Sequence, residues 1–132
     1  MVGELLRSYY DRIDGRPLDR AHEWADDLAG FFADGATIRA GNGSPQPWRS
    51  AFVTDGAKLP ELVASTTHEI VNVVEGVDGR VACELEVTYA LRRGGTVRLH
   101  GSVFAVLRDG RFAEQHLYVD FGPVFRAARK GA

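Results

Sequence analysis

Polar side chains able to do acid–base chemistry recur at every second position of one predicted strand. In "VRLHGSVFAVLRDGRF" (97–112), Arg98, His100 and Ser102 alternate with apolar residues and precede Phe104 on the same ladder. Successive side chains of a strand point to opposite faces, so these four residues share one face. An apolar wall with a few polar groups is typical of a ligand pocket. We therefore expect this face to line a pocket.

His100 is the candidate general acid or base, because histidine exchanges protons near neutral pH without extreme tuning. The alternative is a core histidine whose ring is bonded to backbone carbonyls or to Tyr89. Tyr89, on the neighbouring predicted strand, and Tyr9, on the first predicted helix, are candidate donors to a substrate oxygen. Each tyrosine can equally be an aromatic core residue.

Further residues are expected to contact a ligand without reacting. Ser102 is too weak an acid to act alone and lacks the strand–turn–helix setting of a nucleophilic serine. Asn42 also fits plain turn chemistry, and Gln115 alternates inward with its neighbours. The predicted ligand contacts are Ser102, Asn42, Gln115, Trp24, Trp48, Phe104, Leu85, Val87 and Leu117.

The other histidines receive structural interpretations. His68 opens a strand in "TTHEI" and is interpreted as structural, whereas His22 is expected on an exposed helix surface. His116, Tyr118 and Asp120 alternate on the opposite ladder from Gln115, so we expect them on the outer face of the sheet.

Metal and nucleotide sites are not expected. No histidines, carboxylates or cysteines show the spacing of metal ligands, and "GNGSP" (41–45) neither follows the right strand nor opens a helix as a dinucleotide fingerprint does. The sequence thus predicts an activity without cofactor or metal.

The elements that must position these residues are helices followed by strands. Apolar residues recur every three to four positions across 5–13 and 21–32, which predicts two amphipathic helices, and 48–64 is weakly helical. Residues 36–40 form a predicted short strand. From Thr66 the period changes to two, and Asp78-Gly79, Gly94-Gly95 and Asp109-Gly110 divide the chain into strands at about 66–76, 80–93, 96–108 and 111–121.

This order predicts one α+β domain spanning 1–132, with helices on one face of a mostly antiparallel, curved sheet. The apolar ladder Cys83, Leu85, Val87 and Tyr89 is expected to face the helices. In 96–108 both ladders are apolar enough for burial, and the chain has no further element to cover Val103, Ala105 and Leu107. A second copy packed against the outer sheet face would cover them, so we expect a homodimer.

Composition narrows the possible partners. The chain is 45% hydrophobic and 26% charged with a net charge of −2, which gives no electrostatic reason to expect nucleic acid or a membrane surface. No apolar stretch approaches the length of a membrane span, and the N-terminus lacks the apolar run of a signal peptide. A single cysteine, Cys83, suits a reducing compartment, so a cytoplasmic location is expected.

Four segments resemble, in chain order, the SnoaL-like branch of the nuclear transport factor 2-like superfamily: "FFADGATIRAGNGSP", "THEIVNVVEG", "ACELEVTYALRRGGTV" and "VFAVLRDGRFAEQHLYVDFGPVF". The resemblance covers about 5–125. It implies a cone-shaped domain in which three N-terminal helices and a curved sheet enclose a pocket, usually in a homodimer. It implies no single activity, because one fold hosts many functions.

Two enzymes of that superfamily provide tests of mechanism. The positions that resemble the tyrosine, the aspartate base and the second aspartic acid of ketosteroid isomerase are Tyr9, Ala40 and Ser102, so only the tyrosine matches. The positions that resemble the Asp–Arg–Asp set of limonene epoxide hydrolase are Leu85, Val87 and Leu117. The resemblance therefore implies neither of those two mechanisms.

Residues and resemblance together predict a cofactor-free enzyme that binds an apolar polyketide-, terpenoid- or steroid-like metabolite. The expected reaction is isomerisation, cyclisation or intramolecular epoxide opening by general acid–base catalysis, with His100, Tyr89 and Tyr9 as catalytic groups. The alternative is a non-catalytic module that binds a small ligand or serves as a dimer scaffold.

Overall fold

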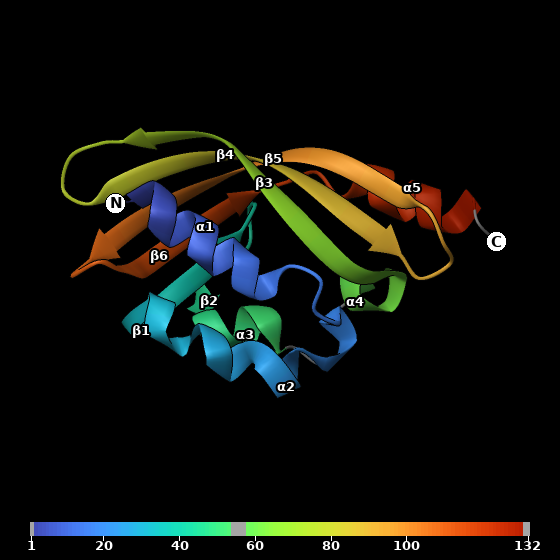
Figure 1. Cartoon of the computed structure of the whole chain (residues 1–132), viewed down its shortest axis with the longest axis horizontal. Coiled ribbons are helices and arrows are strands. Elements are labelled where there is room, and N and C mark those ends of the chain that lie inside the picture. Colours follow the sequence, from blue (N-terminus) through green and yellow to red (C-terminus); the bar gives the residue numbers. More distant parts are fainter. Residues whose placement is uncertain (1, 54–57, 131–132) are drawn as a thin grey trace.

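The computed structural model describes residues 2–53 and 58–130. The chain begins with α1 (Val2–Ile13), followed by a short 3-10 helix η1 (Leu18–Arg20), α2 (Ala21–Trp24) and a second 3-10 helix, η2 (Ala25–Phe31). Strands β1 (Phe32–Ala40) and β2 (Gln46–Pro47) lead to two one-turn helices, α3 (Trp48–Phe52) and α4 (Lys58–Leu62). Figure 1 shows these helices together on one side of the sheet.

Four long strands complete the sheet: β3 (Val63–Glu75), β4 (Arg80–Leu91), β5 (Thr96–Arg108) and β6 (Arg111–Tyr118). The strand order is β2-β1-β6-β5-β4-β3. Among the described strands, only the β1–β6 pair is parallel, and α5 (Gly122–Lys130) follows the sheet. The expected α+β class, with helices before a mostly antiparallel curved sheet, is confirmed.

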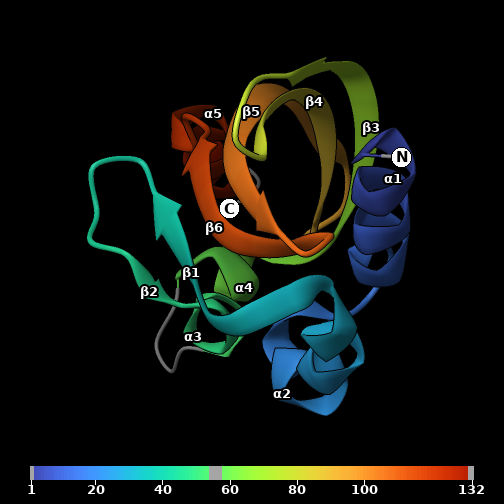
Figure 2. The ribbon, with the colours of Figure 1, turned by 90° about the vertical axis from the view of Figure 1, so that its left-hand side faces the viewer.

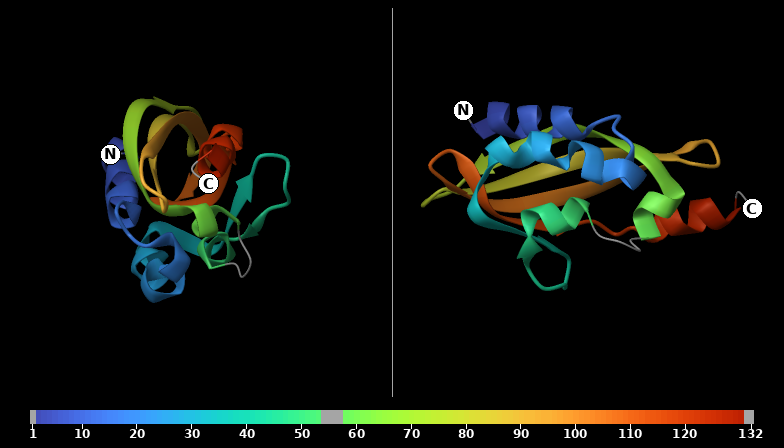
Figure 3. Two further views of the ribbon diagram at one scale, coloured as in Figure 1. Left: turned by 90° about the vertical axis from the view of Figure 1, so that its right-hand side faces the viewer. Right: turned by 90° about the horizontal axis from the view of Figure 1, so that it is seen from below.

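The sheet curls strongly, as the two end-on views show (Figures 2 and 3). Its turns follow the sequence: Asp78, Gly79, Asp109 and Gly110 all have positive φ, between 53° and 75°. These are the angles that the favoured hairpin turns require.

The core lies between the helices and one sheet face, here called the inner face. Leu6, Tyr9 and Tyr10 of α1 are buried against this face, and Leu28 of η2 is fully buried. The inner ladder of β4 is Cys83, Leu85, Val87 and Tyr89, as predicted, and all four side chains are at most 4% exposed.

The register of β5 corrects one expectation. Cys83 pairs with Val103 and Leu85 with Gly101, whereas Glu86 pairs with His100. Directly paired residues of antiparallel strands project to the same face. The inner ladder of β5 is therefore the one that contains Val103 and Ala105, which are 3% and 5% exposed. The expectation that Arg98, His100, Ser102 and Phe104 face the pocket is wrong, as is the expectation that a second copy must cover Val103, Ala105 and Leu107.

Candidate active site

The inner face and the helices enclose a cavity of about 280 Å³. Aromatic and aliphatic side chains form most of its wall, and its polar groups come from Tyr9, Tyr10, Thr66, His68, Tyr89 and Gln115. This composition, largely apolar with a few polar atoms, is typical of sites for small organic ligands.

Most of the predicted catalytic and ligand-contact residues line this cavity. They are Tyr9, Tyr89, Gln115, Trp24, Leu85, Val87 and Leu117. The Trp24 ring is fixed because its Nε1–H donates to the carbonyl oxygen of Pro17 at 2.9 Å.

The other predicted site residues do not line it. His100 and Phe104 are exposed on the opposite sheet face, where Ser102 is half-buried. Asn42 lies in the exposed turn after β1. Trp48 stacks on Phe32 at a ring-centroid distance of 4.4 Å, so its ring supports the core.

The histidine that lines the cavity is His68, not His100 as the sequence had suggested. Its Nδ1 lies 2.6 Å from Oδ1 of Asp14, and its backbone N–H donates to Oδ2 of the same carboxylate at 3.0 Å. Its ring stacks on Tyr10 with centroids 4.4 Å apart. The side chains of His68 and Asp14 are 13% and 20% exposed, so the pair is largely shielded from water.

The turn after α1 brings Asp14 to the sheet. Gly15 has a φ of 78°, which ends the helix, and its N–H donates to the carbonyl oxygen of Thr66 at 3.0 Å. Asp14 is thereby held beside His68 of β3, which lies two residues after Thr66.

The Asp14 carboxylate determines which nitrogen of the neutral His68 ring carries the proton. An ionised carboxylate only accepts hydrogen bonds, so Nδ1 of neutral His68 carries the proton and Nε2 keeps its lone pair. An imidazole oriented in this way by an acid is the usual arrangement of a general base. His68, which the sequence indicated as structural, is therefore the histidine that the fold brings to the cavity.

The cavity tyrosines stay protonated at neutral pH. Burial raises the pKa of Tyr89 to about 12 and raises the pKa of Tyr10 well above its ordinary value. Burial also raises the pKa of Tyr9, and its interaction with the Gln115 side chain acts in the opposite direction but is the smaller effect. Neutral hydroxyls can donate hydrogen bonds to a ligand oxygen.

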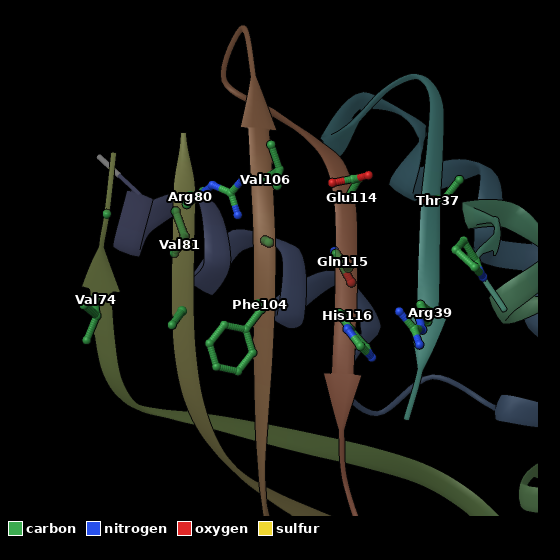
Figure 4. A pocket seen from close by; sticks show the side chains of 14 residues that line it. Thr37, Arg39, Val74, Arg80, Val81, Phe104, Val106, Glu114, Gln115 and His116 are labelled. Atoms are coloured by element: carbon green, nitrogen blue, oxygen red, sulfur yellow. The ribbon is translucent and has the colours of Figure 1, made fainter. Parts of the chain in front are cut away.

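A second hollow, of about 390 Å³, lies on the sheet face opposite the helices, here called the outer face. Figure 4 shows Phe104 near its middle, with Val74 on β3 and His116 on β6 to either side. His116 Nε2 donates to the carbonyl oxygen of Gly41 at 2.7 Å, so its Nδ1 accepts from the Tyr118 hydroxyl at 3.0 Å. His116 and Tyr118 thus lie on the outer face, as predicted.

Residues 2–53 and 58–130 contain neither a cluster of metal ligands nor a helix fit to span a membrane. No cluster of three or more His, Cys, Asp or Glu side chains there could hold a metal ion. None of the described helices has the length and apolar character needed to cross a membrane.

No protein-family model and no curated protein sequence matches the chain, but solved structures share its fold. An NTF2-like protein of unknown function from Exiguobacterium sp. 255-15 is 20% identical, with a TM-score of 0.65 over 88% of this chain and 98% of that one. A proposed SnoaL-like polyketide cyclase from Jannaschia sp. CCS1 is 18% identical, with a TM-score of 0.64 over 80% and 78%.

A third structure has the highest TM-score of the three. It is a protein with a ketosteroid isomerase-like fold from Catenulispora acidiphila DSM 44928, in complex with trimethylamine; it is 12% identical, with a TM-score of 0.72 over 96% of this chain and 92% of that one. These similarities show that the chain has the NTF2-like fold, which includes SnoaL-like proteins. At such identities they show the fold alone.

Proposed function

We propose that the protein is a cofactor-free enzyme that moves a proton on a small apolar substrate, in an isomerisation or cyclisation, with His68 as general base. The observation that carries this proposal is that His68 lies in the wall of an apolar cavity with its Nδ1 2.6 Å from Oδ1 of Asp14. The cyclase named among the structures of similar fold is consistent with such chemistry.

The proposed reaction begins at a carbon next to a carbonyl group. His68 Nε2 takes the proton from that carbon, and the electron pair of the C–H bond passes to the carbonyl oxygen to form an enolate. Tyr89 is the proposed donor to this oxygen, because burial keeps its hydroxyl protonated. The imidazolium then returns the proton to another carbon, or the enolate carbon attacks a second carbonyl of the same molecule and the new alkoxide takes the proton.

The remaining predicted contacts have binding roles in this proposal. Trp24, Leu85, Val87 and Leu117 would hold the apolar body of the substrate. Tyr9 was predicted as a catalytic group from the sequence. Its side chain interacts with Gln115, so in this proposal Tyr9 contacts the substrate without reacting. His100, Ser102, Phe104, Asn42 and Trp48 have no role here.

A neutral bicyclic ketone, 2-tetralone, provides the test, because its C1 protons lie beside a carbonyl and their exchange is visible by NMR in D₂O. We expect the protein to accelerate exchange over buffer alone. We expect His68→Gln to slow the catalysed exchange by about 10²-fold or more, the usual contribution of a general base. The matched control is His22→Gln, because His22 is exposed on α2 outside the cavity and should leave the rate unchanged.

Two results would count against catalysis. Exchange that is equally fast in His68→Gln would remove His68 as the base. Binding of the ketone without any acceleration by the natural protein would instead support the non-catalytic ligand-binding alternative, which the same apolar cavity fits.

We also propose a homodimer formed through the outer face, with Phe104 near its centre. Phe104, Val74 and Tyr118 are 52%, 56% and 44% exposed there, and the Phe104 and Tyr118 rings are 5.8 Å apart. Large apolar side chains gathered on one face are typical of interfaces. The face also carries both charge signs, with Arg39, Arg80 and Glu114 around the hollow and an Arg98–Glu86 ion pair of 2.9 Å along the strands. A patch of mixed sign can pair with its own copy.

Sedimentation velocity tests the dimer. We expect a dimer for the natural chain and a monomer for Phe104→Glu, which places charge at the middle of the apolar patch. Val77→Glu is the matched control, because Val77 is 74% exposed in the β3–β4 turn and does not line the hollow. A natural chain that is monomeric at micromolar concentration would overturn this proposal.

We also propose a cytoplasmic location. The buried free thiol of Cys83 suits a reducing compartment, and fractionation of cells would test this location.

A further inference from the structure

Gln115 carries a buried polar atom without a partner. The side chain is 3% exposed and lines the inner cavity. The side chain lies near Tyr9 and lowers the pKa of that tyrosine, but Nε2 makes no hydrogen bond of normal distance and angle, and it is the only such buried side-chain atom among the described residues. Buried donors in native proteins are nearly always paired, so one left unpaired in a cavity wall calls for a partner from a ligand.

Gln115 and His68 are joined by one wall of aromatic rings. The His68 ring is 4.4 Å from the Tyr10 ring, and the Tyr10 ring is 5.0 Å from the Tyr9 ring. Tyr9 in turn interacts with the Gln115 side chain. The unpartnered amide and the histidine therefore lie at different places along the cavity, separated by the faces and edges of two tyrosines.

The cavity also has a definite charge character. None of the described residues that line it is lysine or arginine, and the charged group nearest to its histidine is the Asp14 carboxylate. An anionic ligand would lose its hydration there without meeting an opposite charge. The cavity therefore suits a neutral ligand.

From these observations we infer that the substrate is a neutral molecule recognised at two points. Its reacting carbon lies at His68, and a second oxygen with no ionised group, an ether or a carbonyl, lies at the far end and accepts a hydrogen bond from Gln115 Nε2. This inference rests on the proposed function, since it uses the same cavity and the same histidine. Gln115 is a positioning residue in it, because the proton transfer takes place at the other end.

Three ketones that differ only at the far ring test the inference: 6-methoxy-2-tetralone, 6-ethyl-2-tetralone and 6-carboxy-2-tetralone. The methoxy and ethyl groups are similar in size, but only the former has an acceptor oxygen. We expect the natural protein to bind the methoxy ketone about five- to tenfold more tightly than the ethyl ketone, the usual value of one hydrogen bond. We expect no measurable binding of the carboxylate.

The variant Gln115→Leu should bring the methoxy-to-ethyl affinity ratio to about one, because leucine has no donor for the methoxy oxygen. Gln115→Met is a second variant of similar size that also lacks a donor, so it should likewise bring the ratio to about one. A folded variant is recognised by its circular dichroism and its cooperative unfolding in urea, so either variant suffices if the other does not fold.

The outcomes separate this inference from the proposed function. A ratio near one in the natural protein, or a ratio unchanged in the variants, overturns recognition by Gln115 even where C1 exchange is intact. Tight binding of the carboxylate overturns the neutral-ligand class. Absence of exchange with all three ketones overturns the proposed base instead.

Discussion

The carboxylate of Asp14 contacts His68 twice, although 54 positions separate the two residues in the chain. Oδ1 lies 2.6 Å from the imidazole Nδ1, and Oδ2 accepts the backbone N–H of His68 at 3.0 Å. One side chain at the end of α1 therefore both orients a ring and joins the helix to β3. The first role concerns activity and the second concerns stability, so substitutions can separate them.

Asp14→Asn and Asp14→Ala should have different effects. The amide of asparagine can still accept the backbone N–H, but its neutral oxygen is a weaker partner for Nδ1 and would stabilise an imidazolium less. We expect Asp14→Asn to slow C1 exchange of 2-tetralone by about tenfold or more and to cost about 1 kcal/mol in the free energy of unfolding. Asp14→Ala removes both contacts and should cost about 2–4 kcal/mol.

Urea denaturation and NMR exchange rates measure the two effects. Asp19→Asn provides a control, because Asp19 forms only a partly exposed ion pair with Arg92 at 3.3 Å and should change stability by less than about 1 kcal/mol. Equal exchange rates in Asp14→Asn and the natural protein would show that the carboxylate does not orient the base.

The sequence was sufficient to predict the elements but not which face each β5 residue occupies. A two-residue Gly94-Gly95 turn would pair residue 93 with residue 96 and would place His100 on the same face as Tyr89. In the structure β4 ends at Leu91, the pairing closest to the turn is Ala90 with Thr96, and Gly94 N–H donates to the carbonyl oxygen of Leu91. The longer turn shifts the pairing by three residues, and any odd shift exchanges the two faces of a strand.

A β-bulge explains why the inner and outer faces of β6 were nevertheless predicted correctly. Leu107 pairs with Phe112, but Val106 pairs with Glu114, so Ala113 is a bulged residue. The bulge reverses the alternation again, and Gln115 returns to the face of Ala105. Neither irregularity has a clear signal in the sequence. The Asp14–His68 pair could not be predicted either, because it depends on how α1 docks on β3 rather than on spacing.

Gly101 should not tolerate a larger side chain. It lies opposite Leu85 on the inner face, and a Cβ atom there would be 2.6 Å from Val119 Cγ2 and 3.3 Å from the carbonyl oxygen of Tyr118. Tyr118 is the last residue of β6 and Val119 follows it, so the end of this strand must move to admit the new atom. We expect Gly101→Ala to lower the free energy of unfolding by about 1–3 kcal/mol, the usual cost of overpacking.

Gly30→Ala is the matched control, because a Cβ atom at Gly30 in η2 would meet no atom within 4 Å. Its stability in urea should equal or slightly exceed that of the natural protein. A similar loss in both variants would mean that backbone freedom rather than the close contact is responsible for the loss at Gly101.

Cys83 should be inert in the folded protein. It is 2% exposed on the inner ladder of β4, and burial, with a smaller contribution from Glu84, raises the pKa of its thiol to about 11. Only the thiolate reacts with disulfide reagents. We expect labelling by a chromogenic disulfide at pH 8 to be at least about 100-fold slower in the native protein than in urea. Labelling at the same rate in both conditions would show that the inner face opens readily to solvent.

The buried tyrosines should make the protein sensitive to alkali. Burial raises the pKa of Tyr89 from 10.0 to about 12, and raises the pKa values of Tyr9 and Tyr10 as well. Below pH 10 all three are neutral in both folded and unfolded chains, so stability is full there. Above pH 10 the unfolded chain loses these protons first, and stability falls by about 1.4 kcal/mol per pH unit for each such tyrosine until the folded group also ionises.

Urea unfolding at pH 8, 10 and 11, with tyrosinate absorbance as a second signal, measures this dependence. Tyr89→Phe removes one of the three ionising groups, so we expect its stability to fall less steeply between pH 10 and 11. The exposed residue Tyr118 is the control position, since Tyr118→Phe should leave the slope unchanged. If the slope in Tyr89→Phe equals that of the natural protein, the Tyr89 hydroxyl is not held in a dry wall, and its proposed contact with an enolate oxygen would lose its physical basis.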